Sequence, residues 1–415
     1  GPAPARASYL DINAILAAAA EAGADAIHPG YGFLSENAAF AQRVAEAGRI
    51  FVGPGADIIA EMGDKGQARR RAEAAGVPVL PGSGRLDPEA TPETLFALAR
   101  QVGFPLLVKA AGGGGGIGMR RVDDEAALPA AVARAQEQAL RSFGDAGVYL
   151  EHFVAAARHV EVQVFGLAPG KVATFPERDC SVQRRFQKVI EESPAAGLPM
   201  GLSGQLRAAA GRLAESVGYL GAGTVEFVVD VATGRFYFLE MNTRIQVEHP
   251  VTEMVTGVDL VALQLRLAAG EDLSGRLRLA PEADGHAIEA RIYAEVPERG
   301  FLPSPGRLSQ LGLPARTAHV RVDTGVRAGD QITPFYDPMI AKLIAWGRDR
   351  EEARARLRAA LDQTCIDGVG CNLGFLKVIL DHEEFCAGRC TTDFVTRQGP
   401  ALLQPQPAEP GIVRV

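Results

Sequence analysis

Two apolar segments joined by a short turn constrain the fold of this chain most strongly. Residues 223–230 and 235–241 are rich in Val, Phe and Tyr and flank a Thr-Gly turn, which is typical of a β-hairpin with a buried face. Glu226 lies inside the first strand, and Glu240 and Asn242 end the second. Because side chains alternate along a strand, Glu240 and Asn242 share one face. The hairpin therefore predicts a sheet on which three oxygen donors converge.

Oxygen donors of this kind favour Mg²⁺ over zinc. Magnesium is commonly held by one or two carboxylates together with substrate phosphates, whereas zinc prefers His or Cys ligands. The alternative is a cross-strand polar patch that faces solvent. Because both strands are otherwise apolar, we interpret Glu226, Glu240 and Asn242 as a metal site.

The residues that follow the second strand are unusually polar. Segment 240–252 contains two glutamates, an asparagine, an arginine, a glutamine and a histidine. A carboxylate at the end of an apolar strand needs a partner, and an ion pair between Glu240 and Arg244 is the simplest interpretation. The density of polar groups favours an active site instead.

A glycine loop supplies the second strong signal. An apolar strand over 104–109 ends in Lys109, five consecutive glycines follow at 112–116, and residues 119–122 predict a returning strand. Such a loop lets backbone N–H groups approach an anion closely. It matches neither a P-loop nor a dinucleotide fingerprint. A flexible linker is the alternative, but the flanking strands favour a mobile lid over ATP phosphates, as in kinases.

The N-terminal residues predict a different layer. Helices and short strands alternate through residue 53, which is typical of a parallel α/β arrangement, and Gly/Pro turns at 28–36 and 52–55 follow the strands. Residues 62–65 are expected to open a basic helix that continues to about residue 75. Lys65 could contact a phosphate there or remain solvated.

The central segments give weaker predictions. A strand over 147–154 carries Glu151 and could cross between lobes beside an adenine. His159, Glu161 and Gln163 share one face of the strand at 158–165, and each taken alone favours an exposed face. Segment 177–193 is too polar for a core, and four of its cations could hold a polyanion; a solvated charged loop is the alternative. Those cations are Arg178, Arg184, Arg185 and Lys188.

The C-terminal half predicts an antiparallel sheet built from strands at 285–291, 319–323 and 339–345, followed by an amphipathic helix over 349–363. With 415 residues, the chain exceeds what one core usually serves. We expect an N-terminal domain with its linker at 1–78, a small lobe with the glycine loop at 79–153, a C-terminal domain at 154–396, and a flexible tail at 397–415.

Charge and cysteine content exclude several classes of function. The net charge of −7 provides no broad surface for nucleic acid or anionic membrane. Five cysteines in so long a chain do not form a disulfide framework, so a reducing cytoplasm is expected. The sequence shows neither a signal peptide nor an apolar run of membrane-spanning length.

Taken together, the motifs closely resemble the biotin carboxylase component of biotin-dependent acyl-CoA carboxylases. The resemblance extends in one order from Gly1 to about Thr396. It implies an α/β ATP-grasp fold with an N-terminal parallel layer that lacks its first strand–helix unit, a mobile lobe, and a C-terminal antiparallel sheet. The motifs are residues 28–37, residues 62–65, Lys109 with its glycine loop, residues 177–188 and residues 240–253.

The resemblance implies a ligase that uses MgATP (or MnATP) and bicarbonate to carboxylate N1′ of biotin on a carrier, through carboxyphosphate. Glu248 would be the general base, Arg244 would fix bicarbonate, and Arg321 would stabilise the oxyanion of the biotin ring. The positions matching the family's ATP site are Lys65, Lys109, Gly115, Gly116, Glu151, His159 and Gln183. Those matching the bicarbonate and biotin sites are Lys188, Arg244, Gln246, Val247, Glu248, Tyr31 and Gly32. The matching metal site is Glu226, Glu240 and Asn242.

The implied partners are a biotin carboxyl carrier protein or domain, a carboxyltransferase subunit and a second copy of the chain. None of the six methionines is followed by lysine, so the biotin acceptor is expected elsewhere. Phe186 and Ile117 depart from the family pattern, since a polar and a basic residue respectively are usual there. Two alternatives therefore stay open: another ATP-grasp ligation, such as carbamoyl phosphate synthesis, and a non-catalytic subunit.

Overall fold

The computed structural model describes residues 1–87, 90–111, 119–275 and 277–403. Its N-terminal layer contains a parallel pair of short strands, with Ala26 opposite Ile50. The flanking helices begin where Asp11 and Asn37 accept hydrogen bonds from backbone N–H groups of the first turn. This confirms the predicted parallel arrangement. The elements are α1 (Ile12–Glu21), β1 (Ala26–Ile27), α2 (Ala38–Glu46) and β2 (Ile50–Phe51).

A small lobe with its own hydrophobic core follows. Its four-stranded sheet has the order β3-β6-β4-β5, and Leu106, Val108 and Leu150 are buried between the sheet and two helices. Strands β4 and β5 pair antiparallel, as predicted. The glycine loop between them, 112–118, lies outside the described residues. The elements are β3 (Gly82–Arg85), α5 (Pro92–Val102), β4 (Leu106–Ala110), β5 (Arg120–Val122), α6 (Leu128–Phe143) and β6 (Val148–His152).

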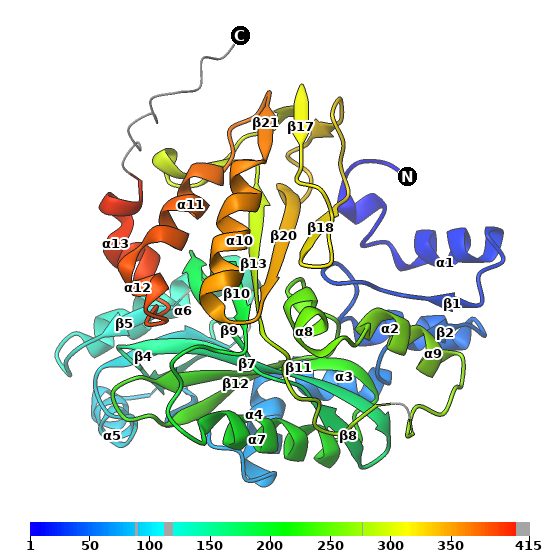
Figure 1. The fold of residues 1–415 in the computed structure, drawn as a ribbon. Coiled ribbons are helices and arrows are strands. Elements are labelled where there is room, and N and C mark those ends of the chain that lie inside the picture. Colours follow the sequence, from blue (N-terminus) through cyan, green and yellow to red (C-terminus); the bar gives the residue numbers. More distant parts are fainter. Residues whose placement is uncertain (88–89, 112–118, 276, 404–415) are drawn as a thin grey trace.

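A large antiparallel sheet forms the body of the molecule (Figure 1). Its strands run in the order β12-β11-β7-β9-β10-β13-β20-β18, and β8 pairs with β7. The predicted hairpin is confirmed as β11 and β12, in which Glu226 lies opposite Glu240. The strands are β7 (Ala157–Ala168), β8 (Lys171–Thr174), β9 (Arg178–Arg184), β10 (Gln187–Ser193), β11 (Gly221–Asp230), β12 (Phe236–Asn242), β13 (His286–Tyr293), β18 (Val320–Thr324) and β20 (Met339–Gly347).

Helices cover both halves of this sheet and close two cores. None of the described helices combines the length and the apolar character that crossing a bilayer requires. The helices are α3 (Ala56–Gly63), α4 (Lys65–Ala74), α7 (Leu202–Ser216), α8 (His249–Thr256), α9 (Leu260–Ala268), α10 (Arg350–Asp362), α11 (Leu373–Asp381), α12 (Glu383–Cys386) and α13 (Phe394–Leu402). Short pieces complete the fold: η1 (Ala5–Ala7), β14 (Glu295–Val296), η2 (Pro297–Arg299), β15 (Leu302–Pro303), β16 (Gly306–Arg307), β17 (Gln310–Gly312), β19 (Gln331–Ile332) and β21 (Cys365–Asp367).

Two boundary predictions are wrong. Met62 belongs to the end of α3, and α4 begins only at Lys65, because the side chain of Asp64 accepts a hydrogen bond from Gln67 N and caps the new helix. The expected flexible tail begins too early. Residues 397–402 continue α13, whose Phe394 and Leu402 are buried in the C-terminal core.

Two predictions of exposure are also wrong. Segment 177–193 is a hairpin, β9–β10, in the middle of the sheet, and every residue of β9 is buried. His159, Glu161 and Gln163 on β7 are buried as well. Their charges are matched by partners on neighbouring strands, which is the condition under which ionised groups are tolerated inside a protein. The turn at Arg185 and Phe186, both with positive φ, and the adjacent Gln187 reach solvent.

Candidate active site

Lys188 occupies the centre of a cluster of acidic side chains. Its Nζ lies 2.5 Å from Glu161 Oε2, 2.9 Å from Glu226 Oε1 and 2.6 Å from Glu248 Oε1. These carboxylates come from three separate segments, β7, β11 and the residue before α8. The buried ammonium is therefore the charge that allows three carboxylates to be close together.

A second buried cation, Arg178, forms the floor of the cluster. The guanidinium is fully buried, and its Nε lies 2.5 Å from Glu161 Oε1. Its remaining donors are satisfied by four neutral side chains, so the group is fixed in position. Those acceptors are Gln163, Thr252, Thr224 and Gln246, at 2.9–3.1 Å.

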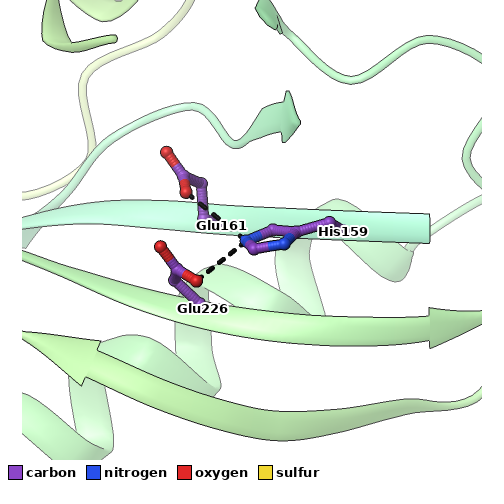
Figure 2. Close-up of side chains that lie close together, drawn as sticks. All are labelled: His159, Glu161 and Glu226. Atoms are coloured by element: carbon purple, nitrogen blue, oxygen red, sulfur yellow. Dashed lines mark ion pairs between the residues drawn. The ribbon is translucent and has the colours of Figure 1, made fainter. Parts of the chain in front are cut away.

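His159 lies beside the same carboxylates (Figure 2). Its Nε2 lies 2.9 Å from Glu226 Oε2 and 3.7 Å from Glu161 Oε2. Gln183 Nε2 lies 3.0 Å from His159 Nδ1. Burial opposes protonation of His159, but the charge of Glu226 outweighs it and raises the pKa of the imidazole. The predicted ATP-site residues His159 and Gln183 thus contact each other and the edge of the acidic cluster.

His159, Glu161 and Glu226 also present ligand atoms within 4.8 Å of one another. A divalent cation would have to compete there with Lys188 and Arg178, because both already contact Glu161. Glu161 is therefore better suited to neutralising these two cations than to binding a metal ion.

The predicted metal residues Glu226, Glu240 and Asn242 do lie together. Glu226 faces Glu240 across the hairpin, and Asn242 Nδ2 donates to Glu226 Oε1 at 3.0 Å. Glu240 is the most exposed of the three, but it still loses part of its hydration between the strands, and this loss, followed by the charge of Glu226, raises its pKa. The negative charge of Glu226 disfavours ionisation of Glu240, and a cation bound between the two carboxylates would remove that penalty. Because all three side chains offer oxygen atoms, the set fits Mg²⁺.

The predicted nucleotide lysines approach this set from the small lobe and α4. Lys109 Nζ lies 2.6 Å from Glu151 Oε1 and 5.5 Å from the centre of the Tyr149 ring. Lys65 is exposed at the start of α4. Partial loss of hydration, followed by the charge of Lys109, lowers its pKa, while Glu240 raises it. Lys65 therefore lies within electrostatic reach of both Lys109 and Glu240. Gly115, Gly116 and Ile117 fall outside the described residues.

The N-terminal layer reaches the site through Glu36. Its Oε2 accepts a hydrogen bond from Arg244 Nε at 2.8 Å, and its Oε1 accepts one from Thr243 N at 3.1 Å. Arg244 Nη2 also donates to Asn242 Oδ1 at 2.8 Å. Gln246 Nε2 donates to Glu226 Oε1 at 2.8 Å. The predicted bicarbonate residues Arg244 and Gln246 thus each contact a predicted metal ligand.

Glu248 lies between two cations. Lys188 contacts its Oε1, and Arg291 Nη2 donates to its Oε2 at 2.9 Å. Burial favours the neutral acid, but the charges of Lys188 and Arg291 outweigh it and hold the pKa of Glu248 well below its usual range. Glu248 is therefore ionised, which is the form that a general base requires.

Arg291 is the residue that the sequence interpretation missed. It stands on β13, whereas Arg321, which was predicted to act near biotin, stands on β18, two strands further along the sheet. Arg321 donates to Asp323 and to Glu253, the latter at 2.6 Å. The local sequence pattern of 286–293 does not distinguish Arg291 from an ordinary arginine on a strand. Its contact with Glu248 in the folded protein identifies it as a site residue.

A pocket of about 700 Å³ opens beside this cluster. Its lining includes Arg291, Lys342, the predicted biotin-site residues Tyr31 and Gly32, and the predicted bicarbonate-site residue Val247. Lys342 Nζ donates to Val247 O at 2.6 Å. The pocket thus connects the N-terminal layer to the acidic cluster and leaves room for a small ring system.

Comparison with protein families covers nearly the whole chain. The model for the biotin carboxylase N-terminal domain matches residues 1–59, and that for the biotin carboxylase C-terminal domain matches residues 289–397. Between them, the model for the carbamoyl-phosphate synthase L chain ATP-binding domain matches residues 64–276.

Among solved structures, the biotin carboxylase domain of 2-oxoglutarate carboxylase from Hydrogenobacter thermophilus, in complex with MgADP, ADP and bicarbonate, has a TM-score of 0.88. It is 40% identical, and the match covers 96% of this chain and 87% of that one. A biotin carboxylase complex from Campylobacter jejuni has the same TM-score at 42% identity, covering 94% of this chain and 86% of that one.

Among curated proteins, the α subunit of rat mitochondrial methylcrotonoyl-CoA carboxylase is 47% identical over 97% of this chain. The chain spans 56% of that relative, or about half the length of several it matches. Biotin carboxylase from Pseudomonas aeruginosa is 48% identical, over 96% of this chain and 87% of the relative. With this identity over nearly its full length, and with the ATP-grasp architecture of these structures, the chain belongs to the biotin carboxylase family of ATP-dependent ligases.

Proposed function

We propose that this chain catalyses the biotin carboxylase half-reaction, in which MgATP and bicarbonate carboxylate biotin on a carrier. The observation that carries the proposal is the ionised Glu248, held between Lys188 and Arg291 and adjacent to a pocket that Arg291 lines. A relative of the same fold has been solved with MgADP and bicarbonate.

The first step is attack of bicarbonate on the γ-phosphate of ATP, which forms carboxyphosphate and ADP. Arg244 would orient bicarbonate by a two-point contact, and Glu248 would accept its proton. When Lys188 or Arg291 turns toward the incoming anion, Glu248 loses a neutralising charge and becomes a stronger base.

The second step transfers CO₂ from carboxyphosphate to N1′ of biotin, with release of phosphate. The released phosphate would take the proton that Glu248 accepted in the first step, so that Glu248 could then take the N1′ proton. We assign stabilisation of the developing ureido oxyanion to Arg291. Arg321, predicted for this role from sequence, has Asp323 and Glu253 as partners. Burial lowers the pKa of each guanidinium, but the neighbouring carboxylates outweigh it and raise both pKa values, so both arginines are charged and position decides between them.

Glu226, Glu240 and Asn242 would hold Mg²⁺, whose charge offsets that of the ATP phosphates when it is bound. Lys65, Lys109, Glu151, His159 and Gln183 would line the nucleotide site with the glycine loop, including Gly115 and Gly116. Asn242 would have to turn its oxygen away from Arg244, which it now contacts. Bicarbonate binding to Arg244 would favour that rearrangement.

The assembly is also part of the proposal. A biotin carboxyl carrier protein or domain would present biotin, a carboxyltransferase would consume carboxybiotin, and the chain would form a homo-oligomer. We further propose the domain division 1–78, 79–153 and 154–396. The separate core of the small lobe supports the middle domain, whereas Met62, Ala68, Ala72 and Val77 pack in the core of the large sheet. Five unpaired cysteines support a reducing compartment such as the cytoplasm.

Steady-state ATP hydrolysis tests the function. The purified chain is expected to release phosphate only with bicarbonate, faster with free biotin, and Glu248→Gln should abolish the stimulation. Ammonium or glutamine in place of biotin should have no effect, and stimulation by either would instead support carbamoyl phosphate chemistry. Absence of any bicarbonate-dependent hydrolysis by the unsubstituted protein contradicts the proposal.

A further inference from the structure

Two buried glutamates behind the active site have no role in the mechanism above. Glu191 on β10 lies directly opposite Glu289 on β13, and neither side chain is exposed to solvent. Directly opposed residues of an antiparallel pair place their Cβ atoms about 5 Å apart on the same face. Two full negative charges at that separation in a dry interior would repel each other strongly.

The hydrogen bonding of this pair is incomplete. Three of the four carboxylate oxygens, Glu191 Oε2 and both oxygens of Glu289, have no hydrogen-bond donor in the part of the chain that the structure describes. Arg291 Nη2 lies 2.5 Å from Glu191 Oε1, which pairs one of the two carboxylates electrostatically. Glu289 lacks an equivalent ion pair among the described residues. A proton held between the two carboxylates would supply both the missing hydrogen bond and the missing charge balance.

The electrostatic surroundings support one retained proton. Burial raises the pKa of Glu191 to about 7 and that of Glu289 to about 8. The charged and titratable groups that face the pair come from β9, β10, β13, β20 and the residue before α8. They are Cys180, Lys188, Glu248, Arg291, Tyr293 and Lys342.

Arg291 connects the pair to the active site. The same Nη2 atom that contacts Glu191 donates to Glu248, and Glu289 and Arg291 point to one face of β13 because they are two residues apart. That face packs against α8, which begins directly after Glu248. Glu191 and Glu248 therefore both contact the same nitrogen of the Arg291 guanidinium.

We propose that Glu191 is a positioning residue for Arg291, and that Glu191 and Glu289 share one proton that rests mainly on Glu289. When Glu248 accepts a proton, it loses its attraction for Arg291. The single negative charge on Glu191 then keeps the guanidinium in place at the pocket. The inference rests on the proposed function only for its catalytic consequence, because the shared proton is a property of the resting protein.

The two glutamates provide matched variants, since both are fully buried and Glu→Gln makes the same chemical change in each. Gln at 289 imitates a protonated partner, so Glu289→Gln should keep biotin-dependent turnover within about twofold of the unsubstituted protein. With Gln at position 191, the carboxylate that contacts Arg291 is lost, and any remaining negative charge of the pair lies on Glu289. Glu191→Gln should therefore lower biotin-dependent kcat by about tenfold or more, with little change in KM for ATP.

Infrared difference spectroscopy tests the proton independently of catalysis. The unsubstituted protein at pH 7 should show the C=O stretch of a buried protonated carboxyl that shifts in D₂O, and Glu289→Gln should lack it. Equal loss of activity in the two variants, or a protonated band that persists in Glu289→Gln, would overturn the inference. If Glu191→Gln fails to fold, the spectra of the other two proteins still decide. If the unsubstituted protein shows the band but no biotin-dependent turnover, the proposed function fails and the proton pair stands.

Discussion

Glu36 accepts a hydrogen bond from Arg244 Nε at 2.8 Å, although the two residues are 208 positions apart in the chain. The carboxylate also accepts the backbone N–H of Thr243. The loop that precedes α2 thus fixes both the backbone and the side chain at the end of β12. The N-terminal layer is therefore connected directly to the residue that we assign to bicarbonate.

Substitution of Glu36 by Gln should raise KM for bicarbonate by about three- to tenfold, because a charge-assisted bond to a partly exposed arginine is lost. The KM for ATP should stay nearly constant, since Glu36 contacts neither Lys65 nor Lys109 in the described structure. Initial-rate kinetics with each substrate varied in turn measure the KM for bicarbonate and the KM for ATP separately. Glu46→Gln, on the exposed surface of α2, is the control, and equal effects from both variants would count against the assignment.

Replacement of Lys188 by Met should abolish turnover and lower the free energy of unfolding by about 3–5 kcal/mol, because buried carboxylates lose their shared cation. Protonation of those carboxylates relieves the repulsion, so the loss should be smaller at pH 6 than at pH 8. Urea unfolding at the two pH values measures both effects.

The control for that experiment is Lys377→Met. Lys377 forms a partly exposed ion pair with Asp362 at 2.7 Å, and such pairs contribute about 0–1 kcal/mol. If the two lysine variants lose similar stability, Lys188 does not hold the acidic cluster together in solution.

Kinetic measurements can distinguish the role of Arg291 on β13 from that of Arg321 on β18. Arg291→Met should lower biotin-dependent turnover by about 10²–10³-fold, which is the usual loss when one donor to a developing oxyanion is removed. Arg321→Met should have a much smaller effect on the same rate. Circular dichroism verifies that both variants are folded. A larger effect at Arg321 would restore the assignment made from sequence.

His249 should make the protein sensitive to mild acid. Burial, followed by the nearby charge of Lys342, lowers its pKa from 6.5 to about 3. Between these values the unfolded chain binds the proton and the folded chain does not, so stability falls as pH decreases through this window. At pH 5 the cost is about 2 kcal/mol by this reasoning.

His249→Gln should therefore lose less stability between pH 7 and pH 5 than the unsubstituted protein, as measured by chemical unfolding at each pH. The exposed His319, stacked on Trp346, provides the matched His319→Gln control. An unchanged pH dependence in His249→Gln would show that other groups cause the acid sensitivity.

Local patterns were sufficient for much of the fold and for the grouping of the polar residues on the hairpin. Alternation of apolar residues predicts β11 and β12, and the spacing of Glu226, Glu240 and Asn242 predicts that they converge. The polar density of 240–252 predicts that an active site follows. These features depend on residues close together in the sequence, where strand and helix periods fix the direction of side chains.

Tertiary structure alone decided which charges are buried. Segment 177–193 is as polar as a surface loop. Its strand β9 nevertheless lies in the middle of the sheet, because Arg178 and Asp179 of β9 form ion pairs with Glu161 and Arg158 of β7, respectively. The same applies to Arg291, whose importance depends on Glu248 and Glu191. The free energy of a charge depends on its partner and its hydration. Both are set by strand pairings between distant segments, which local periodicity does not contain.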